Sequence, residues 1–398
     1  MGASPLTPDA LMVNPIEVVM PTGVLTITTK PGKYSLPTLV DFAARANAKR
    51  GFLFVSKVLG KHWPAKPSAM RDVHESLASQ IPPNLPGPVV FISMAETGIG
   101  LGQGVFEAYL DAEPSRHALF MHTTRYRVGD HQLIEFAEEH SHAPRQFLHM
   151  PADVTARAML MQARSIILVD DESSTGNTFV NLAAACRSLN QDIAHVHLVT
   201  LTNFMGHEAN AKLAKRFGLP VTYSALLDGA FSFTPGQLQP NTASAQRYDP
   251  AADRGASDRF GRLGMTRPLS VPQQFVDQVV QQIGHGERVL VLGTGEFMHS
   301  AFLLGHKLEL RDIDVVVQSS TRSPILEWGA IANAITFQDN YGEGIPNFLY
   351  NVRPGQYDHV FICHETAPNE ALLDLATQLN GHLFHFRSEN LVEEIPVR

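Results

Sequence analysis

The residues best suited to chemistry follow a short apolar run near the middle of the chain. In residues 165–187, SIILVDDESSTGNTFVNLAAACR, an apolar strand is predicted to end in two acids, and a Ser/Thr/Gly loop then opens a helix. Backbone N–H groups of such a loop and of the helix N-terminus form an anion site. The hydroxyls are donors for a phosphate group, Gly176 lets the backbone approach it closely, and Asp170 and Asp171 can accept hydrogen bonds from a ribose ring. The predicted binding residues are Asp170, Asp171, Glu172, Ser173, Ser174, Thr175, Gly176, Asn177 and Thr178.

Strand-like and helical patterns alternate on both sides of this loop. Such alternation predicts an α/β fold, in which parallel strands are joined by crossover helices and ligands bind at the carboxyl ends of the strands. Residues 24–88 are expected to be mixed, with a strand at 24–28 and a helix at 37–48. The clearer predicted strands are 89–93, 118–122, 165–169 and 195–201, and the predicted helices are 101–110, 178–189 and 207–217.

The composition changes between about Thr234 and Leu269. This stretch is polar, rich in Gly, Pro, Ala and Ser, and without apolar periodicity, which predicts a linker or a long surface loop. We therefore expect a first domain at residues 1–238, a polar linker at 239–270 and a second α/β domain at 271–398. The second domain is predicted to hold a helix at 272–283 and strands at 288–292, 314–318 and 359–363.

The strand, the paired acids and the Thr-Gly-Asn-Thr loop resemble the motif with which type I phosphoribosyltransferases bind 5-phosphoribosyl-1-pyrophosphate (PRPP). Aspartate pairs after strands also bind Mg²⁺ in phosphatases and response regulators, but those proteins lack a Ser/Thr-rich loop that leads directly into a helix. The resemblance implies a type I phosphoribosyltransferase fold, a parallel sheet flanked by helices and carrying a hood.

Two upstream segments gain a role from this resemblance. The loop between the strand at 89–93 and the following helix lies where these enzymes hold pyrophosphate, which implies a role for Ala95, Glu96, Thr97 and Gly98. Glu96 is unexpected beside an anion, and action through Mg²⁺ would explain it. After the strand at 118–122, the family has a mobile loop whose basic residue closes over the pyrophosphate. Arg125 is the first choice for this catalytic role and Arg127 the second, and the alternative is a pair of surface arginines.

The acceptor is less clearly marked. Ser56 and Lys57, with Lys61 and His62, form a basic loop after an apolar strand, which could reach phosphate or acceptor or could be a solvated turn. Phe231 or Phe233 could stack on a flat base, although phenylalanine is more often a core residue.

The second domain repeats the pattern of the first. Glu96 aligns with Glu296, Arg125 with Arg322, and the two acids at 170 and 171 with Cys363 and His364. We infer a diverged duplication that has lost PRPP binding, because the acids and the Thr-Gly-Asn-Thr loop are replaced. Its loops could still hold another anionic ligand through Gly293, Thr294, Gly295, Glu296, Thr321, Arg322 and Ser323.

Residues 321–324, Thr-Arg-Ser-Pro, add a second resemblance. The chain is similar to a bacterial family in which an orotate-phosphoribosyltransferase-like domain precedes a TRSP domain, and which is associated with tellurite-resistance and stress-response gene clusters. The resemblance implies that the phosphoribosyl group of PRPP is transferred to a nucleobase-like acceptor, or in the reverse direction from it, with pyrophosphate as the other product. It also implies that PRPP carries Mg²⁺, for which Asp170 and Asp171 are candidate ligands. It also favours a homodimer. The alternatives are a non-catalytic PRPP sensor for the whole chain and a structural or dimerisation role for the TRSP domain.

The overall composition limits the partners. The net charge of −8 over 398 residues gives no basic footprint for a nucleic acid. No apolar stretch is long enough for a membrane span, the two cysteines fit a reducing compartment, and no signal peptide is recognised, so a cytoplasmic protein is expected. The acceptor base, the direction of transfer, the ligand of the second domain and the oligomeric state are left open.

Overall fold

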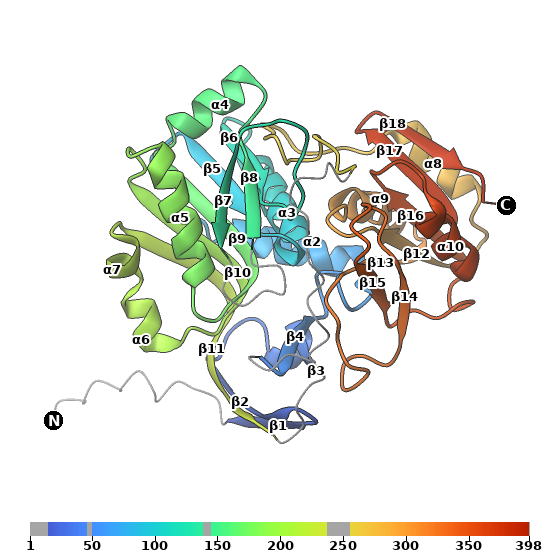
Figure 1. Ribbon diagram of the computed structural model, residues 1–398, viewed down its shortest axis with the longest axis horizontal. Helices are drawn as coiled ribbons and strands as arrows, with labels where there is room; N and C mark the ends of the chain where they lie inside the picture. Colours follow the sequence, from blue (N-terminus) through green and yellow to red (C-terminus); the bar gives the residue numbers. More distant parts are fainter. Residues whose placement is uncertain (1–14, 46–49, 138–144, 237–254, 398) are drawn as a thin grey trace.

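The computed structural model describes residues 15–45, 50–137, 145–236 and 255–397. They form two α/β domains that lie side by side, each built on its own sheet (Figure 1). Residues 239–254 of the predicted linker lie outside the described residues.

The first domain is built on a mainly parallel sheet of seven strands. Its order is β1 (Ile16–Met20), β2 (Gly23–Thr29), β11 (Val221–Pro235), β10 (His195–Asn203), β9 (Ser165–Ser173), β5 (Val89–Ser93) and β6 (Ala118–His122). The five strands from β11 to β6 are parallel, and β2 and β1 add an antiparallel edge. The alternation of strands and helices therefore predicted this part of the fold correctly.

The central strands are continuous apolar runs because helices cover both faces of the sheet. All five residues of β5 are buried, as are the first five of β9, which is the pattern of strands covered on both sides. The helices α2 (Pro67–Ala78) and α3 (Thr97–Asp111) pack on one face. The other face carries α4 (Val154–Met161), α5 (Asn177–Leu189) and α7 (Leu213–Phe217), with α6 (Gly206–Ala211) beside β11.

The helix predicted at 37–48 is wrong. Among the described residues of this range only α1 (Leu36–Leu39) is helical, and the chain then enters a hairpin of β3 (Val40–Ala44) and β4 (Phe52–Ser56). Cross-strand packing, such as that of Phe42 on Phe54 with ring centroids 5.9 Å apart, overrides the weak helical pattern. This hairpin lies with β1 and β2 at one end of the domain and forms the hood (Figure 1). The helix predicted at 207–217 is two short helices, α6 and α7.

The second domain repeats the strand order of the first. The order of strands in its sheet is β13 (Asp314–Ser319), β12 (Arg288–Gly293), β16 (His359–His364), β17 (His382–Ser388) and β18 (Leu391–Ile395). These strands correspond in order to β6, β5, β9, β10 and β11 of the first sheet. The difference is that β18 is antiparallel to its neighbour. The helices α8 (Gln273–Gln281) and α9 (His299–Glu309) pack on one face and α10 (Glu370–Leu379) on the other. Each domain also has a small hairpin, β7 (Leu133–Ala137) with β8 (Arg145–His149) and β14 (Ala334–Gln338) with β15 (Pro346–Tyr350).

Hydrogen bonds recur at equivalent positions and support the inferred duplication. Ala95 N–H donates to Thr123 Oγ1, and Gly295 N–H donates to Ser320 Oγ, each over 2.9 Å. Likewise Thr124 exchanges two backbone hydrogen bonds with the hairpin residue Phe147, and Thr321 does the same with Phe348.

The alignment of the third segment was wrong by one residue. Ser93 pairs with Val169 in the first sheet, and Gly293 pairs with Cys363 in the second, so Cys363 is equivalent to Val169. Both side chains face the helices between the domains, whereas a one-residue slip would turn them to the opposite face. The residues equivalent to Asp170 and Asp171 are therefore His364 and Glu365.

The described part of the predicted linker is not a surface loop. Phe260, Leu263 and Leu269 are buried, and Arg262 is only 1% exposed. Met265 exchanges two backbone hydrogen bonds with Phe120 on the edge strand of the first sheet. Polar composition misled the prediction because the buried apolar residues are widely spaced and make their contacts with other parts of the chain.

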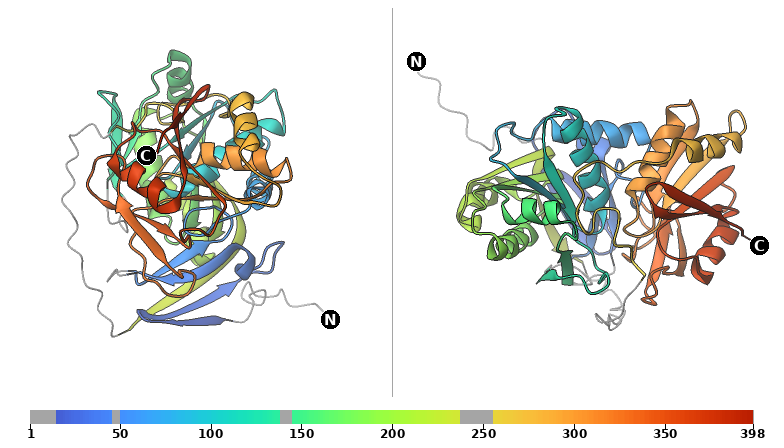
Figure 2. Two further views of the ribbon diagram at one scale, coloured as in Figure 1. Left: turned by 90° about the vertical axis from the view of Figure 1, so that its right-hand side faces the viewer. Right: turned by 90° about the horizontal axis from the view of Figure 1, so that it is seen from above.

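The two domains pack closely through helices and through exchanged edge contacts. α2 and α3 of the first domain meet α9 of the second, between the two sheets (Figure 2). Ala65 of the first domain pairs with Val317 on the edge strand of the second sheet, as Met265 pairs with the edge of the first. The relation between the domains is thus reciprocal.

None of the helices among the described residues is long and apolar enough to cross a membrane. Cys186 and Cys363 are both buried and not disulfide-bonded.

We expect Gly104→Ala to destabilise the protein. A methyl group at Gly104 in α3 would lie 2.1 Å from Nδ1 of His74 in α2, a fully buried ring. Overpacking of this kind costs about 1–3 kcal/mol, which outweighs the higher helix propensity of alanine, about 1 kcal/mol at most. The free energy of unfolding, measured in urea, should fall accordingly. Gly32→Ala is the control, because a methyl group there meets nothing within 4 Å. Equal stability of both variants would contradict the close approach of α2 and α3.

Candidate functional site

The predicted phosphate loop lies at the carboxyl edge of the first sheet. β9 ends at Ser173, and α5 begins at Asn177 after Gly176, whose φ of 71° suits glycine. The N-cap residue of α5, Gly176, has no side chain to cap the helix, and Thr175 Oγ1 accepts a long hydrogen bond of 3.3 Å from the N–H of Asn177. Ser173 Oγ is buried and has no hydrogen-bond partner among the described residues. The uncapped N–H groups and this orphaned hydroxyl suit an anionic ligand.

Two arginines brace this loop. Arg216 donates to the carbonyl oxygen of Thr175 over 2.6 Å and to Oδ1 of Asn177 over 2.5 Å. Arg50 makes an ion pair of 2.7 Å with Glu172, whose pKa is raised by burial, although Arg50 opposes that effect. Glu172 is thus held by Arg50. The hydroxyl residues of the loop remain accessible: Ser174 and Thr178 are partly exposed and Thr175 is exposed.

The second predicted loop lies against the first. A methyl group at Gly98 would lie only 3.0 Å from Oδ1 of Asp170, so the first turn of α3 abuts the end of β9. α3 also begins without a side-chain cap, at Thr97. The residues predicted for ribose and pyrophosphate are therefore neighbours. The N-termini of α3 and α5 both lie at the carboxyl edge of the sheet, one on each face.

Arg125 is not on an exposed loop. Its side chain is 10% exposed, and its backbone N–H donates to Oε1 of Glu296 over 2.9 Å. Arg125 is therefore not a surface arginine, because the second domain covers the segment, and its predicted closure over pyrophosphate stays a prediction. Its Nε does lie near the pyrophosphate loop, 3.8 Å from Oε1 of Glu96. Arg127 is partly exposed and lies over the ring of Phe147.

The candidate acceptor residues do not gather at this edge. Phe231 makes edge contacts with Phe52, Phe54 and Phe204, and Phe233 packs on Phe52, so both belong to an aromatic cluster beneath the hood. Lys57 donates to the carbonyl oxygen of Pro37 at the surface. Ser56 is buried and accepts from the N–H of Val58. Packing within the hood accounts for the contacts of all four.

The structure instead brings a set of charged residues together between the domains. Glu96 receives three cations: Arg322 Nε at 2.9 Å, Lys61 Nζ at 3.4 Å and Arg125 Nε at 3.8 Å. Arg322 and Thr321 come from the TRSP segment, and Thr321 Oγ1 also donates to Glu96 over 3.4 Å. Burial alone would raise the pKa of the Glu96 carboxyl, but the three cations outweigh it and lower the pKa to about 2.

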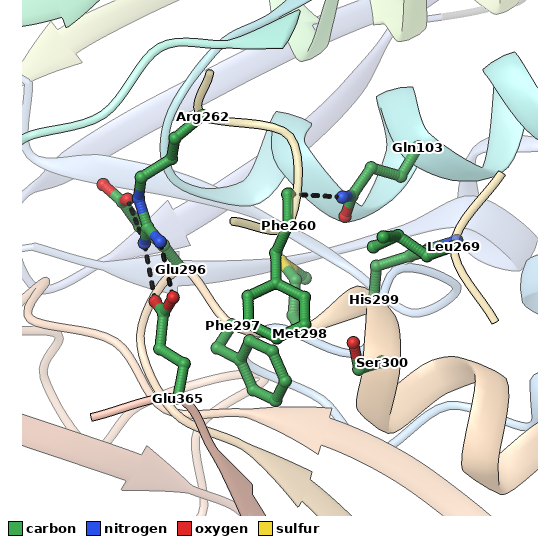
Figure 3. A pocket seen from close by; sticks show the side chains of 10 residues that line it. All are labelled: Gln103, Phe260, Arg262, Leu269, Glu296, Phe297, Met298, His299, Ser300 and Glu365. Atoms are coloured by element: carbon green, nitrogen blue, oxygen red, sulfur yellow. Dashed lines mark hydrogen bonds and ion pairs between the residues drawn. The ribbon is translucent and has the colours of Figure 1, made fainter. Parts of the chain in front are cut away.

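The equivalent carboxylate, Glu296, is held in a matching way. It accepts hydrogen bonds from Thr124 Oγ1 over 2.6 Å and from the N–H of Arg125. Arg262 reaches between Glu296 and Glu365, at 3.0 Å and 2.6 Å (Figure 3). These groups line a small cavity of about 10 Å³, close to the smallest volume that can hold one water molecule.

Glu343 adds a fourth carboxylate, because it pairs with Arg322 over 2.5 Å. This set of charged residues between the domains then holds four carboxylates and four cations. We call these eight residues the interdomain charge cluster: Lys61, Glu96, Arg125, Arg262, Glu296, Arg322, Glu343 and Glu365.

The predicted ligand loop of the second domain is already filled by the protein. Glu365, equivalent to Asp171, accepts from both terminal nitrogens of Arg262 and from the hydroxyl of Tyr341. The side chain of Asn369 caps α10, whose counterpart α5 is uncapped. Gly293 and Thr294 are buried, Lys61 donates to the carbonyl oxygen of Gly295, and Ser323 accepts from Arg45. These loops serve the contact between the domains.

Sequence reasoning missed Lys61 and Arg262 as central residues. Lys61 was only one member of a basic loop, and Arg262 lay in the predicted linker. A signal was present: Gly60-Lys61 and Gly261-Arg262 occupy equivalent places, and both glycines have positive φ. Both cations are 1% exposed.

The donor set suits a magnesium ion that is carried mainly by its ligand. Among the described residues, no three or more His, Cys, Asp or Glu side chains form a group that could hold a metal ion. Asp170 and Asp171 are two oxygen donors beside an anion loop. Mg²⁺ is usually bound by one or two carboxylates together with substrate phosphates, so these residues fit that role.

Fold and site together define an α/β protein with a loop suited to an anion at the carboxyl edge of a parallel sheet. Comparison with known families agrees with this class. Residues 39–230 match a family described as phosphoribosyl transferase, and residues 259–379 match the TRSP domain described as C-terminal to it. The chain belongs to this family of phosphoribosyl transferases with a C-terminal TRSP domain.

Solved structures of phosphoribosyltransferases are similar to part of the chain, at low identity. The adenine enzyme from Trypanosoma brucei, solved with AMP, pyrophosphate and ribose-5-phosphate, shares 12% identity, with 50% of this chain and 82% of that chain covered and a TM-score of 0.34. The adenine enzyme from Giardia lamblia shares 15% identity, with 48% of this chain and 96% of that chain covered and a TM-score of 0.32. The orotate enzyme from Francisella tularensis shares 16% identity, with 40% of this chain and 66% of that chain covered and a TM-score of 0.26. No curated protein matches the chain significantly.

We expect Arg262→Met to destabilise the protein strongly, because it leaves Glu296 and Glu365 buried without their cation. Breaking a buried ion pair from one side costs about 3–5 kcal/mol. The control is Arg311→Met, which removes an ion pair of 2.6 Å with Asp277 at the surface and should cost about 1 kcal/mol or less. Chemical denaturation measures both. Similar losses for the two variants would show that the interdomain charge cluster does not stabilise the fold.

Proposed function

We propose that the chain transfers the phosphoribosyl group of PRPP to a nucleobase-like acceptor and releases pyrophosphate. The observation that carries this proposal is that α3 and α5 both begin at the carboxyl edge of the sheet without a side-chain cap from their N-cap residues, with Gly98 of α3 against Asp170. A ligand with an anion at each end and a sugar between them fits this arrangement, and PRPP is such a ligand.

In this proposal each group of PRPP has a defined place. The 5′-phosphate lies on residues 173–178, where Ser173 Oγ and the α5 N–H groups donate. The ribose hydroxyls donate to Asp170 and Asp171. The pyrophosphate lies at the Ala95–Gly98 loop, close to Arg125, with Arg127 further along the same segment. Bound Mg²⁺ would neutralise part of the pyrophosphate charge.

The reaction needs positioning more than a protein nucleophile. The bond between C1 of ribose and the pyrophosphate oxygen breaks, and its electron pair leaves with pyrophosphate. A nitrogen of the acceptor donates the electron pair of the new bond to C1 from the opposite side, and a neutral acceptor also releases a proton. Fixed cations and helix N-termini stabilise the negative charge that grows on the leaving group.

A non-catalytic PRPP sensor is the second candidate function. Glu96 in the predicted pyrophosphate loop contacts Thr321 and Arg322 of the second domain directly. This favours the sensor, because a ligand bound at the loop would change these contacts and so act on the second domain. The homodimer and the link to tellurite resistance stay predictions from the resemblance, and the cytoplasmic location stays a prediction from the sequence itself.

We expect Asp170→Asn/Asp171→Asn to weaken PRPP binding more than a hundredfold. Hydrogen bonds to charged groups contribute about 1.5–3 kcal/mol each, and about 1.4 kcal/mol is tenfold in affinity. Calorimetric titration with PRPP and Mg²⁺ measures the loss. The matched control is Asp192→Asn, an exposed acid in the turn before β10, at the opposite edge of the sheet.

Pyrophosphate release with a panel of bases separates the two functions. Release that depends on one base would establish the transferase and its acceptor. Binding without release for any base would favour the sensor. Absence of PRPP binding by the folded wild-type protein would exclude both.

A further inference from the structure

We propose that Arg322 of the second domain, together with Lys61 and Arg125, forms the site for the pyrophosphate group of PRPP, and that the Glu96 carboxylate fills this site while no ligand is bound. This inference rests on the proposed function and deepens it. It gives the TRSP domain a direct role, because the domain supplies a cation to the substrate of its neighbour within the same chain.

The first support is the excess of cations around one carboxylate. Three cations converge on Glu96, and one of them, Arg322, also pairs with Glu343. Nη2 of Arg322 is buried and has no hydrogen-bond partner in the described part of the chain. A diphosphate offers more acceptor oxygens and more negative charge than a carboxylate, so it would match these donors better.

The second support is position. Glu96 directly precedes α3, whose N-terminus has no side-chain cap. Two residues later, Gly98 packs on Asp170 at the end of β9. An anion that replaced the Glu96 carboxylate would therefore lie between an uncapped helix N-terminus and the acids assigned to ribose. That is where the leaving group of a ribose bound at Asp170 must be.

The third support is the difference between the two halves. Glu296, the counterpart of Glu96, meets Arg262, the counterpart of Lys61, but Arg262 is also held by both oxygens of Glu365. Its charge is already neutralised by two carboxylates. Lys61 has Glu96 as its ion-pair partner and otherwise donates to the carbonyl oxygen of Gly295 and to Ser319 Oγ. The cations around Glu96 can therefore exchange this carboxylate for a ligand, whereas Arg262 stays bound to Glu296 and Glu365.

We expect Arg322→Met to weaken binding of PRPP and of pyrophosphate, each with Mg²⁺, by about 10- to 100-fold, since a charged hydrogen bond contributes about 1.5–3 kcal/mol. Ribose 5-phosphate, which lacks pyrophosphate, should bind as it does to the wild type, and this also shows that the variant folds. Arg311→Met is the control at the surface.

The outcomes separate this inference from the function on which it rests. Unchanged PRPP affinity in Arg322→Met would overturn the inference and leave the proposed function standing. Equal loss of ribose 5-phosphate and PRPP binding would also overturn it, because Arg322 would then act only on the fold. Failure of the wild type to bind either ligand would overturn the proposed function itself.

Glu96→Gln gives a test with the opposite sign. The amide keeps the size of the side chain and removes the charge that competes for the three cations. Pyrophosphate and PRPP should therefore bind several-fold more tightly, with ribose 5-phosphate unchanged. A carboxylate that acts through Mg²⁺ would give weaker binding instead, so unchanged or weaker binding of pyrophosphate contradicts the role assigned to Glu96.

Discussion

The pairing of charges between the two domains is the constraint on which the rest of the structure depends. Arg262 and Lys61 are 1% exposed, and neither could be buried alone, because the loss of hydration of an unpaired charge costs several kcal/mol. Lys61 pairs with Glu96 of its own domain, and Arg262 pairs with Glu296 and Glu365 of its own. The two carboxylates Glu96 and Glu296 also bind residues of the other domain, Arg322 and Thr124 respectively, and Lys61 donates across to the carbonyl oxygen of Gly295, so the set is complete only when the domains are packed together. The same contacts fix the loop at residues 95–98 and hence one half of the anion site.

The sequence predicted well what depends on local pattern. β5 and β6 begin and end where the apolar runs do. Both strands are covered on two faces, so every residue of each run is buried. The loop at residues 170–178 was recognised because strand, acids, hydroxyls and helix are contiguous. The hood was predicted less well. Residues 40–44 have no strong pattern of their own and become a strand by pairing with β4.

What the sequence could not show depends on residues far apart in the chain. Arg322 and Glu96 are separated by 226 positions, and nothing near either residue indicates the other. The repeat carried the missing information, since it aligned Glu96 with Glu296 and Arg125 with Arg322 before the structure was known. Two related halves that pack reciprocally will bring equivalent residues close to the axis that relates them. The contacts of Thr124 and Arg125 with Glu296, and of Thr321 and Arg322 with Glu96, are the result.

An internal pair differs from a symmetric dimer in one respect that matters for function. In a dimer of identical chains, each substitution appears on both sides of the interface. After duplication within one chain, the two sides can change separately. Here one side has Asp171 and an uncapped α5, while the other has Glu365 bound to Arg262 and an α10 capped by Asn369. The second half has thereby exchanged a ligand site for a permanent salt bridge. Arg262 also reaches Glu296, which accepts hydrogen bonds from Thr124 and Arg125 of the first domain, so the altered loops of the second half contribute to the contact that brings Arg322 to Glu96.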